Sequence, residues 1–530
     1  MPNQFNCSAM KSMYAISMRF LGQKCLKSRM NIAYKAFNAH QIRLLSAALI
    51  GRTAGYLLVC ACCAAAPLAG AQTALPATVL SALEQAGIAP VSMSAIVIPV
   101  DDGAARLAVN TQRAMQPAST VKTVTTQVAL DVFGPAQQWK TQFLSAAPMR
   151  GGTLAGALHV RGGGDFAFSA ERLHKALRAL RAQGIRAIAG NIVLDRSRFT
   201  PPRLDLGAPP FDEYPDAYYN LIPDALLLNH NMLEFMLIAD ARRIRVQTAQ
   251  TIYRVRISAA KLKLVERDCG DWADDFQVPQ VIADAAGLIT VVLQGSFPRN
   301  CTISTETNVL DRNVFWERVL RAQLREIGIA WHGSVRDGVV PADAKPLHES
   351  SSEPLAAIIR AINKDSDNGM TRLLLLNLGA AQTAGSANTL EAGRAAVDAW
   401  FDRAGIARAA LVVENGSGLS RTERVSAEQL AYLLRTAARG RWSAEFLASL
   451  PIAGVDGSMR ERLAGTAAQQ AARIKTGTLG NVIGVAGYVH APGGQMQVVV
   501  GLVNHANAKR GRAALDALIE WVASPQAATP

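Results

Sequence analysis

Cysteine is scarce in this sequence, and its placement is uneven. Five of the seven cysteines precede residue 72, which leaves Cys269 and Cys301 in the rest of the chain. No His/Cys spacing typical of a zinc site occurs, because the histidines are scattered. The run Gly162-Gly163-Gly164-Asp165 lacks the lysine and the following helix of a phosphate-binding loop, so it predicts a turn. We therefore expect no metal ion and no cofactor.

Charged residues are also few, at 18%, while apolar residues make up 50%. This composition favours buried cores and excludes a disordered or coiled-coil protein. At 530 residues the chain is too long for one compact core and predicts two or three domains. Residues 1–71 hold eight Lys or Arg and no acid, so most of the net charge of +14 lies there. The remainder has no basic stripe interleaved with aromatics, which argues against nucleic acid; its small positive excess favours anionic wall polymers or, alternatively, only solvates the surface.

The first 71 residues predict an export leader. Basic residues up to Arg52 precede an apolar stretch over 56–66, and Ala69-Gly70-Ala71 offers a signal-peptidase site before Gln72. The leader is roughly twice the usual maximum length, so a later methionine is an alternative start. A membrane anchor is the other alternative, but the uncharged run is short for a span. We expect a periplasmic protein whose membrane association is at most peripheral.

Three short polar clusters stand far apart in a fixed order. They are Ser119-Thr120-Val121-Lys122, Ser366-Asp367-Asn368 and Lys475-Thr476-Gly477. Together they supply the residue types of an acyl-transferring site in which serine is the nucleophile and lysine manages the proton. Singly each cluster is weak, since Ser258 and Lys261 show the first spacing too. The prediction therefore requires that the three clusters meet in space.

The context of Ser119 separates it from the other candidates. It follows Gln116-Pro117-Ala118 and precedes a stretch, Thr120–Phe133, whose apolar residues have helical spacing. A helix there places Lys122 one turn from Ser119, on the same face. A plain helix N-cap is the alternative role for this serine.

The chemistry of acyl transfer explains the residue types. A serine hydroxyl needs a base, and Lys122 becomes one only if burial and a nearby cation, Lys475, lower its pKa. Ser366 is expected to relay a proton to the leaving amine, and Asn368 either to hold a substrate carbonyl or to steady the lysine. The ammonium of Lys475 and the hydroxyl of Thr476 suit a terminal carboxylate.

Backbone groups complete the predicted site. Gly477 has no side chain, so a substrate can lie against its strand as an added β-strand. We expect the backbone N–H groups of Ser119 and Thr478 to form the oxyanion hole.

Both ends of the chain predict strands of one antiparallel sheet. The candidates are a hairpin over 94–100 and 106–110, three strands over 472–475, 482–490 and 496–504, and a closing helix over 511–524. With helices packed on such a sheet, Ser119 and Lys475 become neighbours.

The three clusters, in this order, resemble those of the penicillin-recognising serine enzymes. Within these the chain is most similar to the D-alanyl-D-alanine carboxypeptidase/endopeptidase family of low-molecular-mass penicillin-binding proteins. The likeness covers nearly all of the chain after residue 72. Further matches are Pro117-Ala118 before the first cluster, Arg161–Asp165, Asn191–Asp195 with Ser197-Arg198-Phe199, Tyr219-Asn220 with Leu228-Asn229, and Asn415–Ser420.

This resemblance implies an α+β fold. A β-lactamase/transpeptidase-like catalytic domain, with an antiparallel sheet flanked by helices, would comprise residues 72–147 and 345–530. The 247 residues from Ser119 to Ser366 exceed any loop, so a β-rich inserted region, 148–344, with one or two subdomains, is expected between the first two clusters.

The inserted region has its own predicted elements. Strand candidates are 153–160, 187–194, 235–237, 251–257, 262–266 and 288–293, and 171–183 is a helix candidate; two further helix candidates, 313–327 and 354–363, lead back to the catalytic domain. Cys269 and Cys301 lie in this region, and in an exported chain they suit a disulfide, with two free thiols as the alternative.

The resemblance further implies a serine DD-peptidase that cleaves the D-alanyl-D-alanine bond, or a D-alanyl cross-link, of peptidoglycan stem peptides and is acylated by β-lactams. The substrate's carboxylate would lie on Lys475, Thr476 and Thr478, with Arg421 and Arg473 as further candidates or surface ion-pair partners. A β-lactamase-like hydrolase of the same fold is disfavoured, because no Glu-x-x-x-Asn segment follows the second cluster. A non-catalytic peptidoglycan-binding protein is disfavoured because all three clusters are intact.

Overall fold

The computed structural model describes residues 72–382 and 388–525. The predicted leader, with its cleavage site and alternative starts, lies outside the described residues. Within the described part of the chain, no helix is long and apolar enough to cross a membrane. The described residues belong to one compact unit.

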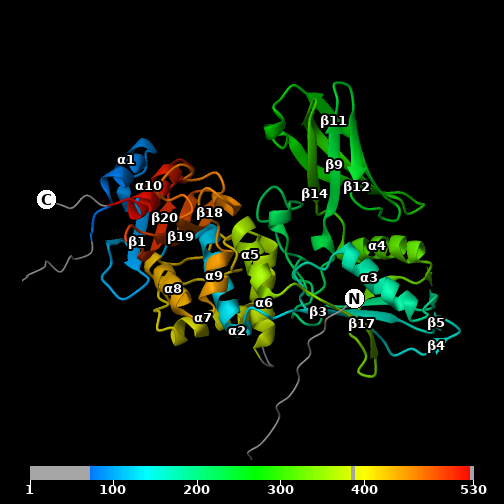
Figure 1. The fold of residues 1–530 in the computed structure, drawn as a ribbon. Coiled ribbons are helices and arrows are strands. Elements are labelled where there is room, and N and C mark those ends of the chain that lie inside the picture. The colour runs from blue at the N-terminus through cyan, green and yellow to red at the C-terminus, as the bar shows by residue number, and fades with distance from the viewer. Residues whose placement is uncertain (1–71, 383–387, 526–530) are drawn as a thin grey trace, which may run out of the picture. The chain divides into compact units, whose positions relative to one another are not determined.

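A five-stranded sheet is built from both ends of the chain, as the sequence predicted (Figure 1). Its strand order is β18-β19-β20-β1-β2, and every neighbouring pair is antiparallel. The strands are β1 (Met93–Pro99), β2 (Leu107–Val109), β18 (Ala472–Leu479), β19 (Val482–His490) and β20 (Met496–Asn504). Strand β18 lies at an edge; the outer side of its first residues pairs with 451–453 through a bridge between Arg473 and Ile452, and among the described residues the outer side from Lys475 onward has no strand partner.

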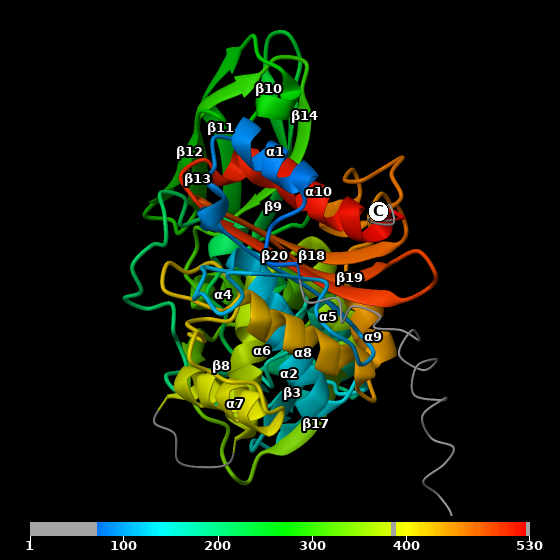
Figure 2. The same ribbon diagram turned by 90° about the vertical axis from the view of Figure 1, so that its left-hand side faces the viewer.

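Helices cover both faces of this sheet (Figure 2). Along β1, Ala95 and Val97 join one apolar core while Ile96 and Ile98 join the other, because successive side chains of a strand point to opposite faces. The first core is shared with α1 (Ala77–Gln85) and α10 (Arg512–Ala523). The second is shared with α2 (Lys122–Phe133), α5 (Leu355–Asp365), α6 (Asn368–Ala381), α7 (Thr389–Arg403), α8 (Ala427–Arg439) and α9 (Ser443–Ser449).

The residues between the first two clusters form four further sheets. Their strand orders are β16-β8-β6-β3-β17, β15-β7-β5-β4, β10-β9-β14 and β11-β13-β12. The strands are β3 (Lys140–Ser145), β4 (Met149–Arg150), β5 (Thr153–Leu154), β6 (Leu158–Arg161), β7 (Ala187–Ile188), β8 (Ile192–Asp195), β9 (Leu233–Ala239), β10 (Ile244–Thr248), β11 (Val255–Val265), β12 (Phe276–Ala283), β13 (Ile289–Pro298), β14 (Thr302–Thr307), β15 (Ala330–Trp331), β16 (Val335–Asp337) and β17 (Lys345–Ser351).

A separate apolar core stabilises this region. The helices α3 (Ala170–Ala182) and α4 (Arg312–Ile327) contribute Leu177 and Trp316 to it, and the strands contribute Phe143 among others. The α+β fold expected from the sequence is thus present, including a β-rich region between the first two clusters. Because β3 pairs with β17, with Ser145 opposite Lys345, the chain enters and leaves this region through adjacent strands. The domain boundaries at 147/148 and 344/345 stay a prediction.

Most predicted elements are confirmed, but four strand candidates differ. The candidate over 153–160 is split into β5 and β6, and the one over 187–194 into β7 and β8, because the chain turns where Gly156 and Gly190 approach each other closely. The candidates over 251–257 and 262–266 are instead one strand, β11. An irregularity in its pairing between Ser258 and Lys261 lets it continue.

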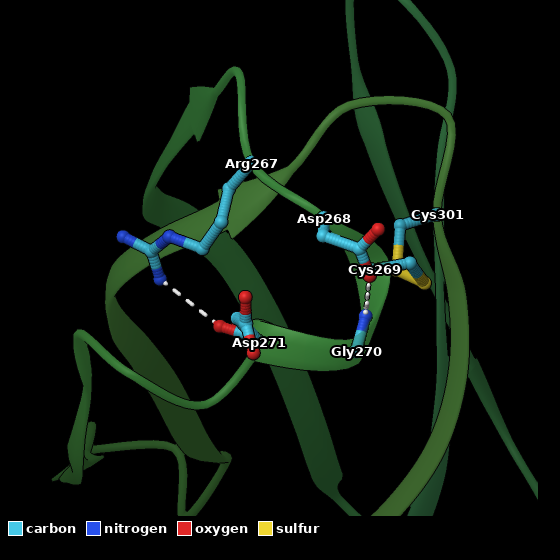
Figure 3. Close-up of a disulfide and its surroundings, with 6 residues drawn as sticks. All are labelled: Arg267, Asp268, Cys269, Gly270, Asp271 and Cys301. Carbon is cyan, nitrogen blue, oxygen red and sulfur yellow. Dashed lines mark hydrogen bonds between the residues drawn. A yellow bond between two sulfur atoms is a disulfide. The ribbon is translucent and has the colours of Figure 1, made fainter.

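The disulfide between Cys269 and Cys301 is confirmed, with 5.4 Å between the two Cα atoms. It joins a short 3₁₀ turn, Cys269–Asp271, to the residue that precedes β14 (Figure 3). The turn is ordered locally, since the Asp268 carboxylate accepts the Gly270 N–H at 2.7 Å and Arg267 donates to the Asp271 carbonyl at 3.3 Å.

Replacing both cysteines by alanine should lower the free energy of unfolding by about 2–4 kcal/mol, because the 32-residue loop then gains freedom in the unfolded chain. Urea denaturation of the variant and the parent measures this difference. Mass spectrometry of an unreduced tryptic digest should contain the linked pair of peptides. Free thiols at Cys269 and Cys301 in the native protein would contradict the assignment.

Candidate active site

Ser119 lies in a strained turn at the start of α2. A 3₁₀ turn, Ala118–Val121, runs directly into the helix, and Ala118 has a φ of +46°, a region that costs an L-residue energy. Ser119 is half-buried inside this turn. Because α2 begins after Val121 with no side-chain cap, the alternative role of Ser119 as a helix N-cap does not apply.

Lys122 is fully buried, and its side chain contacts Ser119 and Asn368. Its Nζ atom donates to Ser119 Oγ at 3.1 Å and to Asn368 Oδ1 at 2.7 Å. It also donates to the backbone carbonyl of Ser417. Of the two predicted roles for the Asn368 amide, its geometry fits the one of steadying the lysine.

The second cluster lies between two helices. Ser366 follows α5 with a φ of +61°, and Asp367 caps α6 by accepting the Met370 N–H at 2.7 Å. This sharp reversal directs Ser366 and Asn368 into one site. The intervening region supports it, because Tyr218 donates its hydroxyl to the Asp367 carboxylate.

A second contact from the intervening region fixes the orientation of the Asn368 amide. Its Nδ2 donates to the Tyr219 carbonyl at 3.0 Å, which leaves Oδ1 for Lys122.

The third cluster lies on β18, the open edge strand. Lys475 is fully buried, and its Nζ donates to Ser366 Oγ at 2.9 Å and to the Thr476 carbonyl at 2.8 Å. A Cβ atom on Gly477 would lie 3.0 Å from the Ser119 nitrogen, so the strand passes directly beside the serine turn. Thr478 is exposed next to it. All eight predicted site residues therefore gather around Ser119, while their individual roles stay predictions.

Burial dominates the electrostatics of both lysines. It lowers the pKa of Lys122 well below its ordinary value, and the nearby Lys475 lowers it further, while Asp367 and Glu423 oppose the shift. Burial lowers the pKa of Lys475 to about 7. The pair therefore meets the condition for a lysine base, which is an amine that can be neutral near physiological pH.

Sequence reasoning missed two contributions to this site. One is the Ser417 carbonyl: the run Asn415–Ser420 is a match to the family in the sequence analysis, but no role is predicted for it there. The other is the support from Tyr218 and Tyr219, which no local pattern connects to a cluster so far along the chain. Both depend on tertiary packing.

Arg421 and Arg473, the further candidates for contact with the substrate's carboxylate, contact residues other than Ser119. The Arg421 guanidinium stacks 4.9 Å from the Phe211 ring centroid and donates to the Phe211 carbonyl at 3.1 Å. Arg473 lies on β18 opposite Tyr488. Of the scattered histidines, His230 has a structural partner, since its Nε2 lies 2.9 Å from the Phe166 carbonyl oxygen. Across residues 72–382 and 388–525, no cluster of three His, Cys, Asp or Glu is placed to hold a metal ion.

A serine held by one buried lysine and faced by a second on an edge strand defines the site type of the penicillin-recognising serine enzymes. Residues 75–524 match the profile of the D-Ala-D-Ala carboxypeptidase 3 (S13) family, and the chain belongs to this family. The resemblance seen in the sequence is thereby confirmed.

Curated relatives and a solved structure agree with this placement. The chain is 31% identical to a D-alanyl-D-alanine carboxypeptidase of Actinomadura sp. (strain R39) over 403 residues, 72% of either chain. It is 26% identical over 406 residues to D-alanyl-D-alanine carboxypeptidase DacB of Haemophilus influenzae, covering 74% of this chain and 80% of the relative. The crystal structure of penicillin binding protein 4 (dacB) from H. influenzae shares the fold, with a TM-score of 0.68 at 22% identity over 83% of this chain and 97% of that one.

Replacing Asn368 by aspartate should raise the pKa of Lys122, because a carboxylate then contacts its Nζ. Since the lysine acts as a base only when neutral, the acid limb of the rate–pH profile for acylation by benzylpenicillin should move to higher pH. Stopped-flow or fluorescent-penicillin kinetics measure this profile. Asn368→Ala, which adds no charge, should slow acylation without that alkaline shift, and an equal shift in both variants would contradict the assignment.

Proposed function

We propose that the protein is a serine DD-peptidase that cleaves the bond between two D-alanyl residues at the end of a peptidoglycan stem peptide. The observation that carries this proposal is the contact of the buried Lys122 Nζ with Ser119 Oγ, in a site that a second lysine, Lys475, closes from the facing strand. Membership of the S13 family and 31% identity to a D-alanyl-D-alanine carboxypeptidase support it.

In the proposed reaction the neutral Lys122 amine takes the proton of Ser119 as Oγ attacks the scissile carbonyl. The oxygen of the tetrahedral intermediate is stabilised by the backbone N–H groups of Ser119 and Thr478. When the C–N bond breaks, the proton that Lys122 took from Ser119 passes through the Ser366 hydroxyl to the leaving amine, so Lys122 is neutral again, while Lys475, 2.9 Å from Ser366 Oγ, keeps its charge. A water molecule then hydrolyses the ester, with Lys122 again as the base.

The substrate's terminal carboxylate is placed on the third cluster. The Lys475 ammonium provides the charge, and the hydroxyls of Thr476 and Thr478 provide donors. The Thr476 hydroxyl donates to Ser458 Oγ at 2.7 Å, so its hydrogen has to turn from Ser458 to the carboxylate when substrate binds. Because Gly477 leaves the edge strand bare beside Ser119, the stem peptide can extend along β18.

β-Lactams are proposed to acylate the same serine, since their strained amide and carboxylate suit the same groups. A relative of this fold, penicillin binding protein 4 of H. influenzae, has been solved in complex with a β-lactam. Rapid antibiotic hydrolysis is not expected. The buried carboxylate of Glu423 has both oxygens occupied by backbone N–H groups and so provides no base for a deacylating water.

The site of action follows from the substrate. Peptidoglycan lies outside the cytoplasmic membrane, and the first 71 residues have the basic and apolar pattern of an export signal. We therefore propose a periplasmic enzyme. The disulfide between Cys269 and Cys301 suits an oxidising compartment.

Ser119→Ala should abolish both D-alanine release from purified muropeptides and covalent labelling by a fluorescent penicillin, because it removes the nucleophile. Ser258→Ala is a matched control: Ser258 shows the same spacing to a lysine, Lys261, but lies on β11 and should leave both activities unchanged. Mass spectrometry of the muropeptide products also separates loss of a terminal D-alanine from cleavage of cross-links. Wild-type protein that neither releases D-alanine nor opens cross-links would overturn the proposal.

The second-order rate constant for acylation by benzylpenicillin should decline above pH about 7, because Lys475 loses its proton there and with it the charge that binds the carboxylate. Its acid limb should lie below the ordinary range of a lysine, since Lys122 must be neutral to act. Lys475→Arg keeps the charge and should extend activity to higher pH. A wild-type rate constant that rises steadily to pH 10 would contradict the assigned role of Lys475.

A further inference from the structure

A buried carboxylate lies beside the site yet has no part in the reaction described above. Glu423 is fully buried. Its Oε1 accepts the backbone N–H groups of Glu414, Asn415 and Gly416 at 3.2, 3.0 and 2.6 Å, and its Oε2 accepts that of Gly418 at 2.9 Å. One side chain therefore fixes the backbone of a whole turn, which we name the 414–418 turn.

The 414–418 turn contacts the side chain of Lys122 and lies against the backbone of Ser119. Its Ser417 carbonyl accepts a hydrogen bond from Lys122 Nζ. At Gly418, where φ is +86°, a Cβ atom would lie 2.1 Å from the Ala118 carbonyl oxygen and 2.6 Å from the Ser119 nitrogen. A shift of this turn would therefore displace the lysine and the serine together.

Helix α2 holds the turn from the opposite side. The Thr125 hydroxyl donates to the Gly416 carbonyl at 2.8 Å, so the turn is clamped between α2 and Glu423. Of these two contacts, the one to Glu423 engages four backbone groups and is charge-assisted, which makes it the stronger.

The carboxylate form of Glu423 fits its surroundings. Burial raises the pKa of its carboxyl, and the four backbone N–H groups oppose that shift. Because both oxygens already face donors, a proton on either would point at another N–H. The resulting negative charge acts on Lys122 together with Asp367, against the positive charges of Lys475 and Arg372.

We propose that Glu423 is a positioning residue for acyl transfer: it fixes the 414–418 turn so that the Ser417 carbonyl aims the Lys122 amine at Ser119, and its charge sets the pH range in which that amine acts. This inference rests on the proposed function. Glu423 touches neither the nucleophile nor a substrate bound there, so it works only through the turn and its field.

Glu423→Gln tests both parts of the proposal. The amide has one accepting oxygen and sets a donor against the other backbone N–H groups, so the turn should shift. The plateau rate constant for acylation by benzylpenicillin should fall by about 100-fold, the usual effect of a misplacement near 1 Å. Because an opposing charge is lost, the acid limb of the profile should move down by about 1 pH unit.

Glu520→Gln is the matched control. Glu520 also accepts backbone N–H groups, those of Ala467 and Ala468, but lies on α10 away from Lys122, so its variant should keep the wild-type rate and profile. Glu423→Asp keeps the charge on a shorter side chain and should lower the plateau while leaving the acid limb in place. Thermal unfolding identifies the folded fraction of each variant.

An acylation rate and acid limb equal to those of the wild type in folded Glu423→Gln would overturn the proposal, as would a lower melting temperature with unchanged kinetics. If Glu423→Gln does not fold, Glu423→Asp decides alone, and a wild-type plateau overturns the proposal. Failure of the proposed function is distinct, because the wild-type protein itself would then show no acylation.

Discussion

Two lysine side chains, Lys122 and Lys475, are buried beside one serine, and the chemistry of the site depends on what this burial does to their pKa values. Within the described residues, the hydrogen-bond acceptors at their Nζ atoms are hydroxyl, amide and carbonyl oxygens rather than carboxylates. Removing a charge from water without a paired counter-ion is costly. Burial therefore disfavours the charged form of each amine and lowers its pKa. The neutral amine that results is what the proposed mechanism needs.

The fold brings these groups together from distant parts of the chain. Lys475 comes from an edge strand near the C-terminus, Ser119 and Lys122 from a turn and helix near the start of the described chain, and Ser366 from a reversal between two helices. The sheet that joins β1 to β20 makes this possible, because it pairs the two ends of the chain in one antiparallel register. The region between the first two clusters contributes as well, through the contacts of Tyr218 and Tyr219 with the second cluster.

Periodicity and short motifs predicted much of this arrangement. The strands over 482–490 and 496–504 match β19 and β20 residue for residue, because both are apolar on both faces and bounded by clear turns. The three clusters could be named from sequence because acyl transfer requires particular side chains at fixed spacing. A disulfide between Cys269 and Cys301 could be predicted, with two free thiols as the alternative, because they are the two cysteines that follow the predicted leader.

Backbone contributions and long-range supports could not be predicted in the same way. Every residue type has a backbone carbonyl, so the side chains around Ser417 do not indicate that its carbonyl contacts Lys122. Glu423 looks like an ordinary surface acid in the sequence, and only the folded turn shows that it is buried. The splitting of 153–160 and 187–194 into short strands depends on the close approach of Gly156 and Gly190 from two separate segments.

The account's central claim is that Lys122 is neutral at the pH at which the enzyme acts. Carbon NMR of protein labelled at lysine Cε, with the Lys122 resonance assigned from its absence in Lys122→Gln, measures this protonation state directly. The account predicts a titration midpoint well below the ordinary lysine value of about 10.4. A resonance that stays that of a charged ammonium up to pH 10 would contradict it.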